Sequence, residues 1–187
     1  MEENVKTKKV AGLEVSALCL GCWEIGGGTA WGDVREGEAI RLVHAAHDLG
    51  VNFIDTAPVY GTGASEKIIG RAVAGRRSDY IISTKCGLNW RQMEGRLEYD
   101  RDGLKVFRNV AAEAIRADLE DCLRRLNTDY IDIFITHRQQ DEILVAETMG
   151  ELLKLKAEGK IRGIGIKNSK PAHLSEYQKY EIGRAHV

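Results

Sequence analysis

The sequence predicts an α/β protein built from parallel βα units. Five short runs rich in apolar residues are each followed by a stretch with helical spacing. The runs end near residues 21, 55, 85, 137 and 168, and three of the four intervals are about 30 residues long. Units of this length fit either a barrel or a doubly wound sheet. No G-x-G-x-x-G motif follows the first run, which disfavours the dinucleotide-binding form of the doubly wound sheet.

The predicted strands are short and apolar. We expect a buried strand at 17–22 (ALCLGC) and further strands at 51–55, 80–85, 130–136 and 161–166. Ahead of them, residues 7–10 and 13–16 flank Ala11-Gly12 and predict a small N-terminal hairpin.

The predicted helices cover residues 36–49, 65–73, 109–126, 143–158 and 171–180. Ser65 is placed to cap the second of them, and Pro171 suits the first turn of the last. Residues 87–108 are too long and polar for a plain turn, so we expect a functional or mobile loop there.

Composition excludes several classes of protein. The 27 basic and 28 acidic residues of this 187-residue chain give a net charge of −1, so no basic field is available to recruit nucleic acid or an anionic membrane. No apolar run approaches the roughly 20 residues that cross a bilayer, and the polar start lacks a signal-peptide core. We therefore expect a cytoplasmic protein with reduced thiols.

Two pairs of residues could be read as metal or redox sites. Cys19 and Cys22 form a C-x-x-C, but residues three apart on a strand point to opposite faces, and no second pair completes a zinc site. His44 and His47 lie three apart on a predicted helix without a carboxylate or cysteine in register, which favours a packed or solvated helix face. We predict no metal site.

Polar side chains gather where the predicted strands end, at Asp55, Tyr60, Lys85, His137 and Asn168. In a βα barrel this rim is the active-site face. A phenol beside a lysine can act as an acid toward a carbonyl oxygen if the ammonium lowers its pKa from about 10. Taken singly, Asp55 could be a turn former, Lys85 a solvated lysine and His137 a satisfied core histidine.

Several motifs together resemble the aldo-keto reductase superfamily. They occur in the order and spacing of that family, from about residue 8 to 180, and comprise 53–57 (FIDTA), Tyr60-Gly61, Ser65-Glu66, 83–85 (STK), 132–137 (DIFITH) and 159–166 (GKIRGIGI). The resemblance implies a (β/α)8 TIM barrel, with about five βα units present and the short hairpin in front, that reduces aldehydes or ketones with NADPH, or with NADH.

The resemblance also implies roles for individual residues. Tyr60 is the general acid, Asp55 and Lys85 tune it, and His137 orients the small-molecule carbonyl substrate. Asn168 holds the nicotinamide carboxamide, and Asp55 is counted with it among the cofactor-binding residues. Either Trp23 or Trp31, from the loop after the first strand, is expected to line the substrate pocket. The oligomeric state stays open.

Two positions depart from the family pattern. Lys167 stands where a small Ser or Ala usually precedes the asparagine, and a long cation there is expected to crowd the nicotinamide. After His137, the chain reads Arg138-Gln139-Gln140 instead of aromatic-Pro-Asp, a variation that occurs in one branch of the family.

The C-terminal residues 181–187 (EIGRAHV) do not continue the pattern, and we interpret them as a translated sequencing adapter. Residues 1–180 are then expected to form the N-terminal part of one barrel domain that usually needs about 250 residues. Such a fragment would expose sheet edges, aggregate, and bind NADPH weakly or not at all.

Two alternatives to a reductase stay open at this stage. One is a redox-sensing regulatory subunit built on the same barrel, which would bind the cofactor without turning over an aldehyde. The other is a lyase in which Lys85 forms a Schiff base with its substrate.

Overall fold

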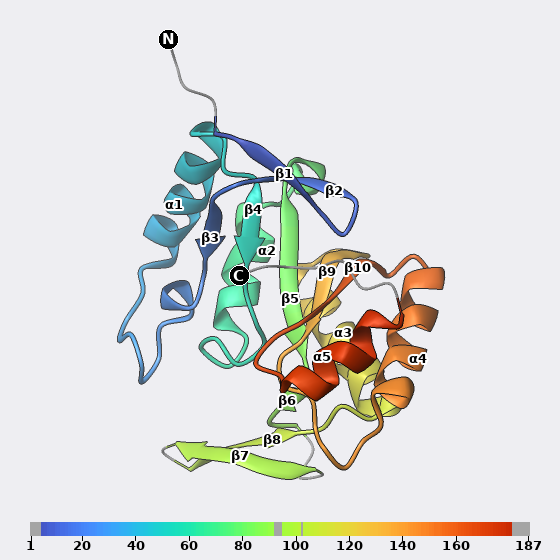
Figure 1. Ribbon diagram of the computed structural model, residues 1–187. Coiled ribbons are helices and arrows are strands. Elements are labelled where there is room, and N and C mark those ends of the chain that lie inside the picture. Colours follow the sequence, from blue (N-terminus) through green and yellow to red (C-terminus); the bar gives the residue numbers. More distant parts are fainter. Residues whose placement is uncertain (1–4, 92–94, 102, 181–187) are drawn as a thin grey trace.

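A five-stranded parallel sheet forms the centre of the structure, a computed structural model that describes residues 5–91, 95–101 and 103–180 (Figure 1). Residues 181–187, interpreted above as an adapter translation, lie outside this range. The strands are β3 (Cys19–Gly21), β4 (Phe53–Asp55), β5 (Ile81–Cys86), β9 (Ile131–Thr136) and β10 (Ile161–Ile166). All five predicted strands are therefore present.

The order of the strands decides between the two predicted sheet types. Across the sheet it is β10-β9-β5-β4-β3, so each new strand of the chain pairs beside the one before it. A doubly wound sheet reverses its order at a switch point, and no reversal occurs among the described strands. The sheet is thus wound in one direction, as in a barrel wall.

Helices follow the strands and cover one face of the sheet (Figure 1). Four agree with the predicted spans to within about two residues, and α3 begins three residues late; they are α1 (Glu36–Asp48), α2 (Ala64–Ala72), α3 (Ala112–Leu126), α4 (Val145–Ala157) and α5 (Pro171–Gln178). The late start of α3 has a local cause, because the Asn109 side chain accepts a hydrogen bond from the Ala111 N–H at 3.0 Å and forms a turn. Pro171 occupies the first turn of α5, as expected.

The predicted cap of α2 is wrong. Gly63, with a φ of 87°, precedes the helix, and no side chain caps it. The Ser65 hydroxyl instead donates to the Cys22 carbonyl at 2.7 Å and lies 2.8 Å from the Thr56 hydroxyl. Ser65 therefore ties the helix to the strand ends, a long-range contact that the local pattern does not contain.

The predicted burial of the first strand is partly wrong, and α1 buries only some of its apolar residues. Strand β3 spans three residues and pairs with β4 alone, so Leu18 beside it is 62% exposed. In α1, Ala39 and Val43 are buried while Leu42 and Leu49 are exposed. The buried stripe of this helix is the one that packs on α2, and it is rotated away from the leucines.

The N-terminal hairpin is confirmed as β1 (Thr7–Val10) paired with β2 (Leu13–Ser16). It turns through Ala11 and Gly12, both at positive φ, as a tight two-residue turn requires. Ser16 and Asn52 exchange backbone-to-side-chain hydrogen bonds of 2.7 and 3.1 Å, which hold the hairpin at the end of the sheet where the strands begin (Figure 1).

Within residues 87–108, where we expected a functional or mobile loop, the described residues form a second sheet. Its antiparallel strands are β6 (Leu88–Asn89), β7 (Arg96–Arg101) and β8 (Leu104–Arg108), in the order β6-β8-β7. This small sheet lies beyond the ends of the parallel strands (Figure 1), and Arg91 fastens its start to α3 through Asp118 and Asp121. Two short elements complete the fold, the 3-10 helices η1 (Glu24–Gly26) and η2 (Arg77–Asp79).

The core lies between the parallel sheet and the helices. Alternate strand residues such as Ile54, Ile82 and Phe134 are fully buried there. The intervening residues point to the opposite, concave face, where charged side chains line a cavity. In the described part of the chain, no helix has the length and apolar character that a membrane span requires.

Candidate active site

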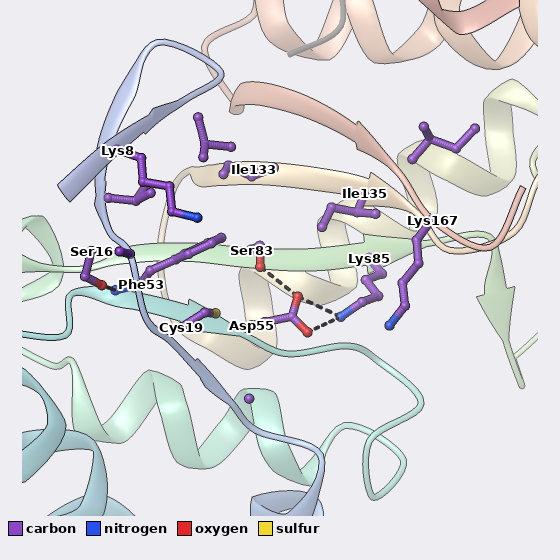
Figure 2. Close-up of a pocket in the computed structure, with 15 residues that line it drawn as sticks. Lys8, Ser16, Cys19, Phe53, Asp55, Ser83, Lys85, Ile133, Ile135 and Lys167 are labelled. Atoms are coloured by element: carbon purple, nitrogen blue, oxygen red, sulfur yellow. Dashed lines mark hydrogen bonds and ion pairs between the residues drawn. The ribbon is translucent and has the colours of Figure 1, made fainter. Parts of the chain in front are cut away.

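An ion pair joins neighbouring strands on the concave face of the sheet. Asp55 ends β4 and Lys85 lies on β5, and the period of two along each strand turns both side chains to the same face. The Lys85 Nζ lies 2.9 and 2.8 Å from the two Asp55 carboxylate oxygens (Figure 2). The predicted pairing of these two residues is present.

Two further groups complete the surroundings of this pair. The Lys85 ammonium, 1% exposed, also donates to the Thr56 carbonyl at 2.7 Å, and the Ser83 hydroxyl donates to Asp55 Oδ1 at 2.8 Å. Sequence reasoning missed Ser83, although it stands in the same STK motif and faces the same way as Lys85. The three protons of the ammonium all have acceptors, which opposes the neutral amine that a Schiff-base lyase needs.

Tyr60 lies in the loop that follows β4, directly beside the ion pair. The Lys85 Nζ is 4.8 Å from the centre of its ring, and the Trp23 ring stacks on it at 6.0 Å. The backbone at Tyr60-Gly61 also packs against Gly26, so closely that a Cβ on Gly61 would lie 1.8 Å from the Gly26 carbonyl oxygen. The close contact with Gly26, at the end of η1, thus fixes the loop that carries Tyr60.

The pKa of Tyr60 moves in the opposite direction to the one expected. Partial burial and the Asp55 carboxylate raise the pKa of Tyr60 to about 12, while Lys167 acts to lower it. Burial and Asp55 dominate this shift, and Lys167 is the cation named as opposing it, so Lys85 does not set the direction of the shift as predicted. Tyr60 is therefore held as a neutral phenol, ready to donate a proton.

His137 follows β9 and is buried. Its Nδ1 atom has no hydrogen-bond partner among the described residues, so it is not a satisfied core histidine. Burial, followed by the positive charges of Lys85, Lys167 and Arg138, lowers the pKa of His137 to about 3. The imidazole is thus neutral near pH 7 and can donate one hydrogen bond.

Lys167 and Asn168 follow β10 at the same rim. The Lys167 backbone N–H donates to the Thr136 carbonyl at 3.0 Å, and its half-buried side chain lines the cavity beside β5 (Figure 2). Asn168 is exposed, with a φ of 51° that non-glycine residues seldom adopt outside asparagine. Such backbone conformations are frequent at ligand sites.

Trp23 and Trp31 form a cluster over Tyr60, with ring centres 5.6 Å apart in an edge-to-face arrangement. Both are nearly half exposed. Trp23 also lines a second, smaller cavity of about 250 Å³, together with Tyr99 and Leu104 of the small antiparallel sheet. The structure thus places Trp23 and Trp31 beside Tyr60. It also places Tyr99 and Leu104 of the small antiparallel sheet at this second cavity, and sequence reasoning missed both residues.

The main cavity on the concave face has a volume of about 390 Å³. Asp55, Lys85 and Lys167 line it near the strand ends, and Phe53, Ile133 and Ile135 supply an apolar wall (Figure 2). Charged groups thus lie at one end of this cavity, and hydrocarbon lines most of the rest.

The cysteine and histidine pairs have structural contacts. Burial raises the pKa of Cys22, which keeps this thiol protonated, whereas Cys19 is exposed. His44 Nε2 lies 2.7 Å from the Ala72 carbonyl, and His47 Nδ1 lies 3.0 Å from the Arg76 guanidinium. Among the described residues, no three His, Cys, Asp or Glu side chains are arranged to hold a metal ion.

The geometry can be compared with known proteins. The sequence model of the aldo/keto reductase family matches residues 17–185, which is most of the chain. The chain belongs to the aldo/keto reductase family. Among curated relatives of this family, it is 40% identical over 173 residues to the NADH-specific methylglyoxal reductase of Escherichia coli K12, covering 90% of this chain and 53% of that protein.

Solved aldo-keto reductase structures agree with the fold. A glycerol dehydrogenase from Gluconobacter oxydans superposes with a TM-score of 0.81 at 39% identity, covering 92% of this chain and 51% of that one. An aldo-keto reductase from Klebsiella pneumoniae in complex with NADPH gives 0.72 at 28% identity, covering 94% and 54%. The chain thus spans about half the length of its relatives and contains the corresponding part of the (β/α)8 barrel.

Proposed function

We propose that the protein containing this chain reduces a small aldehyde or ketone to an alcohol, with Tyr60 as the general acid. The observation that carries the proposal is the convergence of four residues from the ends of three neighbouring strands. Asp55 ends β4, Lys85 on β5 pairs with it, Tyr60 in the loop after β4 lies with its ring centre 4.8 Å from Lys85 Nζ, and the positive charge of Lys85 acts on His137 after β9. Family membership supports the same reaction.

In this proposal each side chain has a definite task. Tyr60 donates its proton to the carbonyl oxygen as negative charge develops there, and the Asp55–Lys85 ion pair, with Lys85 Nζ 4.8 Å from the centre of the Tyr60 ring, lies beside the phenol. Asp55 and Ser83 keep the ammonium in position. His137, neutral and buried, offers a second hydrogen bond to the same oxygen.

The residues present fit a nicotinamide cofactor at the end of β10. The amide of Asn168 has both a donor and an acceptor, which complement a carboxamide, and its side chain is exposed beside the cavity. When bound, NADPH or NADH supplies the hydride. Relatives of this chain include an NADH-specific reductase and a structure in complex with NADPH, so both nucleotides belong in the test.

The proposal includes a cytoplasmic location and a small-molecule substrate, without nucleic acid. The four cysteines are all free, which suits a reducing compartment, and the charge balance is close to neutral.

The test uses the full-length protein with simple aldehydes and follows the loss of NADPH or NADH absorbance. We expect Tyr60→Phe to lower kcat at least about 100-fold, because the proton donor is removed while the ring is kept. Tyr130→Phe is the matched control. Tyr130 directly precedes β9, at the end of the parallel sheet where the strands begin, and its ring contacts Arg77 and Arg162. Unchanged turnover in Tyr60→Phe, or no aldehyde-dependent oxidation at all, would contradict the proposed function.

A further inference from the structure

A buried hydroxyl on α5 connects this helix to both sides of His137. Tyr177 is fully buried, and its phenol donates to the side-chain oxygen of Gln139 at 2.7 Å. The same hydroxyl lies 3.2 Å from the Thr136 hydroxyl. A phenol oxygen can both donate and accept, so it bonds to the two groups at once. Thr136 directly precedes His137 and Gln139 follows it by two positions, so one side chain of α5 holds both flanks of the histidine.

The Gln139 side chain extends this contact to the loop after β9. It is buried, and its amide nitrogen donates to the carbonyls of Ile143 and Gln140 at 2.9 and 3.2 Å. Its oxygen accepts the proton of Tyr177. Both ends of the amide are therefore bonded inside the protein, as a buried amide requires. The chain that follows His137 is thus tied to α5 as far as Ile143.

The imidazole of His137 has no comparable anchor of its own. Its Nδ1 atom is buried without a hydrogen-bond partner among the described residues. The main chain is held instead. The His137 N–H donates to the Cys86 carbonyl at 3.0 Å, and the Thr136 carbonyl accepts from the Lys167 N–H at 3.0 Å. The direction of the ring thus depends on the main chain on either side of it, and a hydrogen bond weakens steeply when its angle is wrong.

We propose that Tyr177 is a positioning residue, whose hydrogen bonds fix the main chain on both sides of His137 and with it the direction of the imidazole. The inference rests on the proposed carbonyl reduction, in which His137 donates a hydrogen bond to the carbonyl oxygen. The Tyr177 hydroxyl is buried and occupied by its two contacts, so it is not available to a ligand and acts only through the histidine.

The first experiment removes the hydroxyl and keeps the ring. We expect Tyr177→Phe in the full-length protein to lower kcat for a simple aldehyde about 5- to 20-fold, because the group that meets the carbonyl oxygen is misdirected. The KM for the nucleotide should change less than about twofold, since the cofactor does not meet this hydroxyl.

A second genetic background separates positioning from a general defect. In His137→Gln, the further change Tyr177→Phe should alter kcat less than about twofold, because the residue that it positions is already gone. A structural defect would lower kcat by the same factor in both backgrounds, and that result would overturn the inference.

Tyr80→Phe is the matched control. Tyr80 is also buried, and its hydroxyl has no hydrogen-bond partner among the described residues. It directly precedes β5, at the end of the sheet where the strands begin. We expect Tyr80→Phe to keep kcat within about twofold of the wild type, because it removes a buried hydroxyl but no bond to the flanks of His137. Equal losses of kcat in Tyr80→Phe and Tyr177→Phe would overturn the inference.

A spectroscopic measurement keeps the inference testable if reduction itself is not observed. In nitrogen-15 spectra of the full-length protein labelled at histidine, the imidazole signal that disappears in His137→Gln identifies His137. We expect this signal to shift or broaden in Tyr177→Phe and to stay in place in Tyr80→Phe, because only the first variant frees the main chain beside the ring.

Gln139→Met removes the same hydrogen bond from its other end, and it replaces Tyr177→Phe in this measurement if that variant does not fold. A His137 signal that is unchanged in the folded variant overturns the inference. A signal that shifts as expected, in a protein that turns over no carbonyl compound, contradicts the proposed function alone.

Discussion

The two sides of the cavity rim differ in how completely their polar groups are paired. At the ends of β4 and β5, Asp55 and Lys85 exchange two short contacts, and Ser83 and the Thr56 carbonyl satisfy the remaining groups. At the ends of β9 and β10, His137 Nδ1 has no partner among the described residues, and Lys167 has no counter-ion there.

This difference separates two kinds of task. A fully paired, buried cluster holds its geometry without a ligand, because each charge is already stabilised by its neighbours. An incompletely paired group gains most from a ligand, because binding removes its desolvation cost. We therefore assign the positioning of Tyr60 to the first side and the recognition of substrate and cofactor to the second.

The largest expected effect concerns the paired side. Asp55→Ala leaves the Lys85 ammonium, 1% exposed, without its counter-ion, so we expect the free energy of unfolding to fall by about 3 kcal/mol. Lys85→Met should cost less, about 1 kcal/mol, because the Asp55 side chain is 28% exposed and keeps the Ser83 hydroxyl and water. Urea unfolding of both variants measures the difference.

Lys167→Met is the matched comparison for that experiment, since it removes a lysine from the other side of the same cavity. We expect its free energy of unfolding to stay within about 0.5 kcal/mol of the wild type. If Lys167→Met destabilises the protein as much as Asp55→Ala, the two sides do not differ in the way described.

The next effect concerns pH. His137 has a folded-state pKa of about 3, below its value of 6.5 when unfolded, so the unfolded chain takes up the proton first as the pH falls. The stability contributed by the neutral imidazole is complete above pH 6.5 and is lost toward pH 3, by about 2 kcal/mol at pH 5.

The difference in unfolding free energy between wild type and His137→Gln, measured at pH 8 and at pH 5, isolates this term. Other titrating groups, including buried Asp118, contribute to both proteins and cancel. The cations that face His137 are Lys85, Lys167 and Arg138, and they are present in the wild type and in the variant alike. An identical difference at both pH values would show that His137 is not held neutral by its surroundings.

The smallest effect concerns the backbone of Asn168. Its φ of 51° is tolerated by asparagine and free of strain for glycine, so Asn168→Gly should alter the free energy of unfolding by less than about 0.5 kcal/mol. Asn168→Ala should cost about 1 kcal/mol, because alanine is disfavoured in the left-handed region. Equal stability of the two variants would indicate that the turn after β10 relaxes.

Sequence reasoning could predict that these candidate residues lie at one edge of the sheet because each follows a strand. Asp55, Lys85 and His137 stand directly at the ends of apolar runs, and parallel strands bring such ends to one edge. Ser83 was missed, since a serine within a strand carries no sign of its partner on the next strand.

The small antiparallel sheet was missed for a different reason. Strand β7 (RLEYDR) is charged and exposed, so it lacks the alternation that identifies a half-buried strand. Its pairing with β8, and ion pairs such as Arg108 with Glu98, stabilise it. Those contacts run between two strands and join residues from three to twelve positions apart, and the hydrophobic pattern of β7 alone does not reveal them.

The sequence by itself determined the succession of strands and helices and the identity of the family, because hydrophobic spacing and ordered motifs are local properties of the chain. Only the tertiary structure decided the electrostatics of the site. Lys85 pairs with Asp55, while partial burial and the Asp55 carboxylate raise the pKa of Tyr60, so the phenol keeps its proton. Charges act through distance and burial in three dimensions, which no spacing along the chain records.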